Sequence, residues 1–360
     1  MNLSIKSNYI KSLIRQFIFW TPAIVFWTLM REFGQEIIRP GGLEPLTFTQ
    51  QIRFHLALGL MAGLIFGSLQ FFFEKYIYKR VSFGKTIIIG SVSSLISIFL
   101  LVTFGFRAFS KITQIDFDWE LYQEFVFSRQ MILLIVYIFI VGFLIDFFKE
   151  VDKKFGPGNL WKMLRGEFYH PKEEHRIFMF LDLKSSTTIA EQLGHHKYSR
   201  LIQSCFYDVS DLVIEHKAHI YQYVGDEIVL SWSIEEGLKD LNCIRFYFKY
   251  RDLLESKRNY YESKFGVVPQ FKAGLEMGRV MVAEVGEIKR EIAYHGDVLN
   301  TAARIQACCN EFNRKVLISE NLENALSEIT DSEYELMGDI QLKGKSKNLK
   351  IYAVSDLSMA

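Results

Sequence analysis

Two aspartates occupy positions from which their carboxylates could hold a metal ion. Asp226 lies in a Gly-Asp turn between two short apolar segments, 220–224 and 227–233, a pattern that is a strong signal for a β-hairpin. Asp182 stands near the end of another apolar segment, 177–183, and the Ser/Thr cluster after it is typical of a helix start. A Gly-Asp pair also suits a turn for conformational reasons alone. Two carboxylates at comparable places favour the other interpretation, a site for a hard divalent cation.

Asn300 and Arg304 form a second pair of polar residues with a regular spacing. They lie four residues apart in a predicted helix, 297–311, so both side chains should project from one face. An amide and a guanidinium on one face are fixed donors suited to anionic oxygens. The ordinary alternatives are a capping or surface role for Asn300 and a solvated charge for Arg304.

The segments that carry these residues, 176–188, 221–232 and 289–305, together resemble the catalytic domain of the class III nucleotidyl cyclases, the adenylate and guanylate cyclase family. The resemblance covers roughly 176–354 and includes a Leu-Lys-Gly-Lys stretch at 342–345. It implies an α+β catalytic domain with a ferredoxin-like βαββαβ core. It also implies that the 3′-hydroxyl of a nucleoside triphosphate substrate attacks the α-phosphorus, so that pyrophosphate leaves.

The resemblance also implies roles for the two residue pairs. Asp182 and Asp226 would bind two divalent ions, Mg²⁺ or Mn²⁺, with the backbone carbonyl of Leu183 as a further ligand. One ion would lower the pKa of the attacking hydroxyl and the other would neutralise the leaving oxygens. Asn300 and Arg304 match the residues that orient the ribose and stabilise the transition state.

The remaining substrate positions match the family less closely. Lys343 matches a lysine that holds the terminal phosphates, and Lys289 stands where members often carry a phosphate-binding arginine. Arg290 is adjacent, and the choice between these two stays open. Gln222 and Ala293 occupy the base-reading positions, where a glutamine amide suits adenine or guanine and an alanine offers no side-chain hydrogen bond. ATP is favoured over GTP only because adenylate cyclase is the commoner bacterial activity of the family.

Members of this family work as head-to-tail dimers whose sites lie at the interface. One protomer supplies the two aspartates, and the other supplies the asparagine, the arginine, the terminal lysine and the base readers. This chain carries both half-sets, so the resemblance implies a homodimer with two equivalent sites.

The first half of the chain carries a membrane signal. Four apolar segments predict an all-α domain of four transmembrane helices: 16–30, 54–73, 86–106 and 130–148. Lys and Arg are denser before the first segment, between the second and third, and after the fourth. The positive-inside rule therefore places both termini and the catalytic domain in the cytoplasm, with the chain as a multi-pass protein of the inner membrane and the lipid bilayer as its partner.

These observations predict three parts: a transmembrane domain at 1–148, a cytoplasmic linker at 149–175 and the catalytic domain at 176–360. Alternating patterns in the last part predict strands and helices in an α+β order compatible with the ferredoxin-like core that the resemblance implies. The predicted elements are strands 177–183, 220–224, 227–233, 270–276, 280–285 and 316–319, and helices 187–217, 235–264 and 297–311.

Competing functions explain fewer of these residues. A diguanylate cyclase would account for Gly-Asp-Glu on a hairpin, but that family expects a second glycine and a phenylalanine that are missing here. A transporter finds little support, since Asp146 is one of few charges in the apolar segments. A catalytically weak, cyclase-like regulatory membrane receptor stays open because of the altered base-reading pair. A net charge of +1 without a basic stripe argues against a nucleic acid partner.

Overall fold

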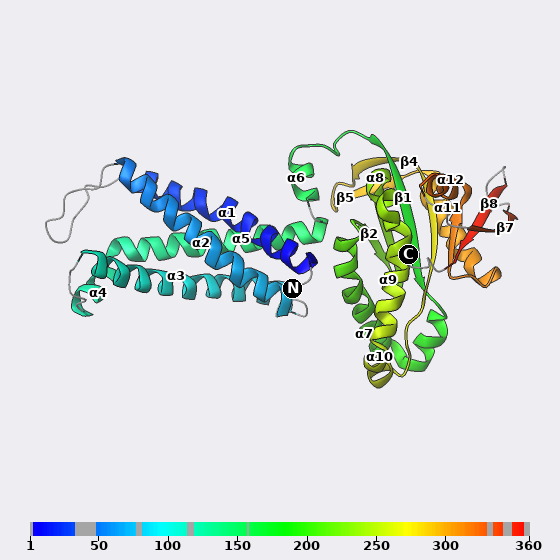
Figure 1. Ribbon diagram of the computed structural model, residues 1–360, viewed down its shortest axis with the longest axis horizontal. Helices are drawn as coiled ribbons and strands as arrows, with labels where there is room; N and C mark the ends of the chain where they lie inside the picture. Colours follow the sequence, from blue (N-terminus) through cyan, green and yellow to red (C-terminus); the bar gives the residue numbers. More distant parts are fainter. Residues whose placement is uncertain are drawn as a thin grey trace. The chain divides into compact units, whose positions relative to one another are not determined.

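The computed structural model describes residues 3–32, 48–76, 81–113, 119–156, 158–329, 334–340 and 348–355 (Figure 1). The chain divides into two compact units, Met1–Lys154 and Phe155–Ala360. Each unit has its own apolar core, one small and helical and the other built on a sheet.

The first unit is helical in its described parts. Its helices are α1 (Leu3–Glu32), α2 (Phe48–Tyr76), α3 (Phe83–Thr113), α4 (Trp119–Val126) and α5 (Arg129–Phe155). The four predicted spans all fall within long helices, α1, α2, α3 and α5. Within the described residues, two stretches are long and apolar enough to cross a membrane, Phe83–Leu100 with a mean hydropathy of 1.7 and Met131–Phe155 with 2.8. Length and composition therefore support two of the four predicted spans.

The second unit is built on a mixed sheet covered by helices (Figure 1). Its strands are β1 (Lys172–Leu183), β2 (His219–Val224), β3 (Glu227–Ser233), β4 (Phe271–Val285), β5 (Glu291–His295), β6 (Val316–Ser319), β7 (Tyr334–Ile340) and β8 (Leu349–Val354). Its helices are α6 (Asn159–Leu164), α7 (Ser186–Glu215), α8 (Ile234–Leu238), a short 3₁₀ turn η2 (Lys239–Leu241), α9 (Asn242–Ser256), α10 (Arg258–Phe265), α11 (Asp297–Glu311) and α12 (Glu320–Ser327).

The order of the strands agrees with the predicted ferredoxin-like core. Along the sheet the order is β2-β3-β1-β4-β6-β8-β7, and β5 pairs with β4. The neighbours β2–β3, β3–β1 and β1–β4 are all antiparallel. Since the chain order of these elements is β1-α7-β2-β3-α9-β4, this part of the unit has the split βαβ arrangement of that core.

Alternation along β1 assigns side chains to the two faces of the sheet. Ile177, Met179 and Leu181 are buried in the main core with residues of α7 and α9, on what we call the α7 face. Phe178 and Phe180 lie on the other side, in a smaller cluster that includes residues of α11, on the α11 face. Asp182 follows in the same alternation, so its carboxylate belongs to the α11 face.

The predicted helix 235–264 is wrong as a single element. The structure has α8, η2, α9 and α10 instead, because Asp240 and Leu241 adopt left-handed backbone angles, with φ of 51° and 56°. Asn242 bridges this break by donating from Nδ2 to the carbonyl of Glu236 at 2.9 Å. The aromatic residues of this region are core, as predicted, since Tyr247 and Tyr250 are buried.

The predicted strands 270–276 and 280–285 are also wrong as separate elements, since β4 runs without interruption from Phe271 to Val285. The glycine between them, Gly278, is a contact point for α11: a Cβ added there would lie 2.7 Å from Cγ2 of Val298. Gly274 has the same role, and its added Cβ would lie 2.2 Å from the backbone nitrogen of Gln306. The two glycines therefore let α11 lie directly on β4.

Gly274→Ala is expected to lower the free energy of unfolding of the catalytic unit by about 1–3 kcal/mol, the usual cost of overpacking a close contact. The contact is between backbones, so no flexible side chain can move aside. Thermal unfolding of the purified protein measures the effect. Gly84→Ala is the control, since an added Cβ there meets nothing within 4 Å. An equal effect of the two substitutions would contradict this explanation of Gly274.

Candidate active site

Three carboxylates gather where β1 ends beside the β2–β3 turn. The register pairs Asp182 directly with Glu227, and Asp226 precedes Glu227 in the turn. Burial and then the charge of Asp226 raise the pKa of Asp182. Burial, followed by the charges of Asp182 and Asp226, raises the pKa of Glu227 to about 7. The structure thus brings the two predicted metal ligands, Asp182 and Asp226, to one place with a third acid beside them.

The polar side chains around Asp182 belong to β4 and α11. Gln306, which is 8% exposed, donates from Nε2 to Oδ2 of Asp182 at 3.1 Å. On the other side, Lys272 is the register partner of Asp182 and is 5% exposed. The ammonium of Lys272 donates to Oδ1 of Asn310, which also belongs to α11. The sequence reasoning missed Gln306, since its contact with Asp182 depends on packing between distant segments.

The carboxylate cluster has the chemistry of a cation site. Oδ2 of Asp226 is buried and has no hydrogen-bond partner among the described residues. A buried, unpaired carboxylate oxygen is costly, and nearby like charges add to that cost. Although Glu227 lies beside the two aspartates, no three His, Cys, Asp or Glu side chains among the described residues are arranged to hold a metal ion together. The two aspartates and a backbone carbonyl such as that of Leu183 are therefore the oxygen ligands that fit such an ion.

Asn300 and Arg304 lie on a different side of α11 from Gln306. The helix spans Asp297–Glu311, as predicted, and its buried residues include Ala302, Ile305 and Gln306. Asn300 is exposed and Arg304 is half-buried, and neither has a hydrogen bond or an ion pair with another described residue. At 100° per residue, Arg304 points about 160° away from Gln306. The predicted transition-state pair therefore faces outward while Gln306 faces Asp182.

A β-bulge places Gln222 on the α11 face. The register passes from Ile220–Leu230 directly to Gln222–Val229, so Tyr221 is the extra residue of the bulge. Gln222 therefore shares the face of Val229, and Tyr221 packs there too. Without the bulge, alternation would send one of these two side chains to the opposite face.

The structure does not bring the side chain of Ala293 to this cluster. Ala293 pairs with Ala283 and its neighbour Tyr294 pairs with Val282, so the two β5 side chains point to opposite faces. Tyr294 is the one on the α11 face, with its ring centroid 5.4 Å from Phe178. Alternation within a short, unpredicted strand decided this orientation.

Of the two predicted phosphate-binding lysines, the structure describes Lys289, which follows the end of β4 opposite to the one that pairs with Asp182. Lys289 is exposed and its ammonium lies 3.0 Å from a carboxylate oxygen of Glu291. Arg290, also exposed, lies 3.7 Å from Glu284. Lys343 and the Leu-Lys-Gly-Lys stretch lie outside the described residues.

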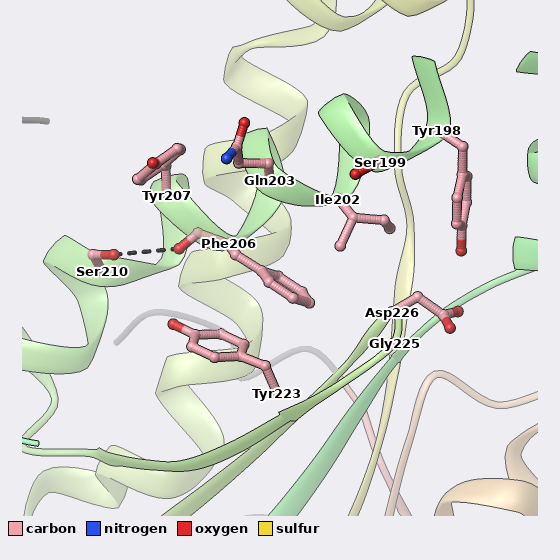
Figure 2. Close-up of a pocket in the computed structure, with 10 residues that line it drawn as sticks. All are labelled: Tyr198, Ser199, Ile202, Gln203, Phe206, Tyr207, Ser210, Tyr223, Gly225 and Asp226. Carbon is pink, nitrogen blue, oxygen red and sulfur yellow. Dashed lines mark hydrogen bonds between the residues drawn. The ribbon is translucent and has the colours of Figure 1, made fainter. Parts of the chain in front are cut away.

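A pocket of about 520 Å³ lies between α7 and the β2–β3 hairpin (Figure 2). The stacked rings of Phe206 and Tyr223, with centroids 4.6 Å apart, form one wall. Asp226 and Tyr198 lie together toward the other end in Figure 2. Burial, followed by the charge of Asp226, raises the pKa of the Tyr198 phenol. The sequence reasoning did not identify Tyr198 as a neighbour of the carboxylates.

Comparison with known proteins agrees with this geometry. A family model described as the adenylate and guanylate cyclase catalytic domain matches residues 168–356. Adenylate cyclase 2 of Rhizobium meliloti (strain 1021) is 30% identical over 227 residues, which are 63% of this chain and 62% of that protein. The adenylate cyclase of Anabaena cylindrica is 24% identical over 182 residues, or 49% of this chain and 36% of that protein. This chain thus spans about three fifths of the first relative and about a third of the second.

A solved structure of a bacterial light-regulated adenylyl cyclase matches 63% of this chain and 65% of that chain, with a TM-score of 0.54 and 18% identity. At this identity the likeness concerns the fold alone. The family model covers more than half of the chain, including β1, the β2–β3 hairpin and α11. This chain therefore belongs to the adenylate and guanylate cyclase catalytic domain family.

Proposed function

We propose that this chain is a membrane-bound nucleotidyl cyclase that converts ATP, with GTP as the alternative substrate, into a cyclic 3′,5′-nucleotide and pyrophosphate as a homodimer. The observation that carries the proposal is the carboxylate cluster at the end of β1. Asp182 and Asp226 lie close enough for the charge of one to raise the pKa of the other, and a buried oxygen of Asp226 has no partner among the described residues. The relatives named above, two adenylate cyclases, support the choice of ATP.

In this proposal Asp182, Asp226 and the carbonyl of Leu183 hold two divalent ions, Mg²⁺ or Mn²⁺. When bound, the ions supply the Lewis acidity that activates the 3′-hydroxyl and neutralises the triphosphate. The fixed turn holds Asp226 beside the end of β1, and Gln306 restrains one oxygen of Asp182. The protein therefore orients the ligands before substrate arrives, which reduces the entropy lost when the site assembles.

Asn300 would orient the ribose, and the guanidinium of Arg304 would stabilise charge on the phosphorane oxygens. Lys343 would hold the terminal phosphates, with Lys289 or Arg290 as an additional contact. Asn300 and Arg304 point away from the side of α11 that touches Asp182 of the same chain. This orientation supports a head-to-tail homodimer in which each site takes its carboxylates from one chain and its arginine from the other.

The membrane part of the proposal has four spans, 16–30, 54–73, 86–106 and 130–148, with both termini and the catalytic domain on the cytoplasmic side of the inner membrane. Two helical stretches, in α3 and α5, support it by length and composition. The Lys and Arg residues that follow the fourth span support the orientation.

Product identification tests the function. The full-length protein, purified in detergent, is incubated with Mn²⁺ and either ATP or GTP, and the products are separated by mass. A cyclic 3′,5′-nucleotide and pyrophosphate are expected in equal amounts. Nucleotide binding with no cyclic product from either triphosphate would favour the alternative, a cyclase-like regulatory receptor.

Discrimination between ATP and GTP is expected to be small. Gln222 can pair with either base, and the side chain of Ala293 offers no hydrogen bond. The difference in transition-state free energy should lie within about 1–3 kcal/mol, the scale of one or two hydrogen bonds. The ratio of kcat/KM for the two nucleotides measures it. A preference of about 10⁴-fold, roughly 5.5 kcal/mol, would show that other residues read the base.

A further inference from the structure

We infer that Gln306 is a positioning residue for Asp182 of its own chain. The inference rests on the proposed function, because it concerns the metal ligands of the proposed cyclase site. It assigns a role to a residue that lies in neither predicted half-set.

The first support is the direct contact. Nε2 of Gln306 donates to Oδ2 of Asp182 at 3.1 Å, and Gln306 is 8% exposed. A neutral amide can hold an ionised carboxylate without competing with the cation for it, as a positively charged side chain would. Metal-binding carboxylates commonly depend on such hydrogen bonds for their orientation. Gln306 therefore sets the direction of one Asp182 oxygen while the other oxygen remains available.

The second support is the way in which the position of Gln306 is restricted. The backbone of Gln306 lies against Gly274, where an added Cβ would be 2.2 Å from its nitrogen and 2.5 Å from its Cα. One turn further on, Cys309 Sγ lies 3.4 Å from the carbonyl oxygen of Ala273. The helix is thus seated on β4 at the point from which Gln306 reaches Asp182, so a shift of α11 would move the amide and the carboxylate apart.

The third support is the division of α11 into two faces. Gln306 faces the sheet of its own chain, whereas Asn300 and Arg304 face outward. In the proposed dimer, Asp182 serves one site and the Arg304 of the same chain serves the other. A single helix therefore touches the metal ligand of one site through Gln306 and carries the transition-state donors of the second site.

The first test measures metal binding without turnover. Binding of Mn²⁺ to the full-length protein is followed by electron paramagnetic resonance in the presence of 3′-deoxy-ATP, which cannot cyclise. Gln306→Met keeps an unbranched side chain of similar length and removes the donor. It is expected to weaken Mn²⁺ binding about 10- to 100-fold, as loss of a partner of a metal ligand usually does. The KM for ATP at saturating Mn²⁺ should be unchanged, since Gln306 does not touch the substrate.

Cys309→Ala is the control, because it loosens the contact between α11 and β4 and keeps the amide of Gln306 that donates to Asp182. Equal loss of Mn²⁺ affinity in Gln306→Met and Cys309→Ala would reduce Gln306 to a packing role. Wild-type affinity in Gln306→Met, with Asp226→Asn unable to bind Mn²⁺, would overturn this inference alone. Wild-type affinity in Asp226→Asn as well would instead overturn the proposed metal site.

The second test uses mixed dimers and places the same substitution in one chain at a time. When Asp182→Ala and Arg304→Ala chains pair, the surviving site takes its aspartates from the Arg304→Ala chain. Gln306→Met in that chain should raise the Mn²⁺ concentration needed for half-maximal activity about 10- to 100-fold. The same substitution in the Asp182→Ala chain should have no such effect, because the Asp182 it would orient is already absent. Equal effects in both positions would show that Gln306 acts through folding or through Arg304.

Discussion

Asp226→Asn is expected to lower kcat by at least about 100-fold, because losing a metal ligand should cost more than the 10- to 100-fold typical of its hydrogen-bonding neighbours. The buried Oδ2 of Asp226 has no partner among the described residues, so the protein provides no substitute for the cation there. An amide at this position keeps the size of the side chain and removes one negative charge. The measurement is initial velocity of product formation against Mn²⁺ concentration.

Stability separates this effect from misfolding. Removing a charge beside Asp182 and Glu227 reduces repulsion, since Asp226 contributes to the raised pKa of both groups. The unfolding temperature of Asp226→Asn without added metal should therefore be no lower than that of the wild type, and the dimer should persist. If Asp226→Asn turned over substrate at nearly the wild-type rate, the assignment of Asp226 as a metal ligand would be wrong.

Mixing two inactive variants is expected to restore activity. Under the proposed function, Asp182→Ala would lack the metal-binding half of its site, and Arg304→Ala would lack the transition-state half. In a mixed dimer, one interface receives the intact halves from opposite chains and the other receives both defects. Random pairing makes half of the dimers mixed, each with one good site of two, so activity should recover to about a quarter of the wild type if the sites are independent.

The time course of recovery provides a further check. Activity should appear at the rate of subunit exchange and should require both proteins, which size-distinguishable tags on the two chains can monitor. If mixed dimers formed and no activity appeared, all catalytic groups would have to come from one chain. The outward orientation of Arg304 on α11 argues against that result, since Gln306 rather than Arg304 faces Asp182.

Local sequence signals were sufficient where the chain's own chemistry specifies the conformation. A Gly-Asp turn between apolar segments predicted the hairpin, and the structure has strands His219–Val224 and Glu227–Ser233. The periodicity of 297–311 predicted α11 with its observed bounds. Turn chemistry and helical periodicity depend on neighbours in the chain, so a sequence can show them without knowledge of the fold.

Other predicted elements failed because a local pattern was overridden. Residues 235–264 were predicted as one helix, yet Asp240 and Leu241, neither of them a glycine, adopt left-handed angles shortly after Gly237. Two strands, 270–276 and 280–285, were predicted with a gap between them, whereas β4 is continuous there and α11 lies on it at Gly278. Leu241 is buried in the main core and Gly278 lies against Val298 of α11, so both positions contact segments that local patterns do not reveal.

The features of the candidate site also fall into those that the sequence predicted and those that only the tertiary structure showed. Sequence motifs alone selected Asp182, Asp226, Asn300 and Arg304, because metal ligation and phosphate stabilisation require particular side-chain types. Only the tertiary structure showed that a bulge at Tyr221 turns Gln222 to the α11 face, and that Gln306, 124 positions away in the chain, holds Asp182. Side-chain chemistry belongs to the residue itself, whereas strand register and helix packing arise from contacts between segments that the sequence keeps far apart.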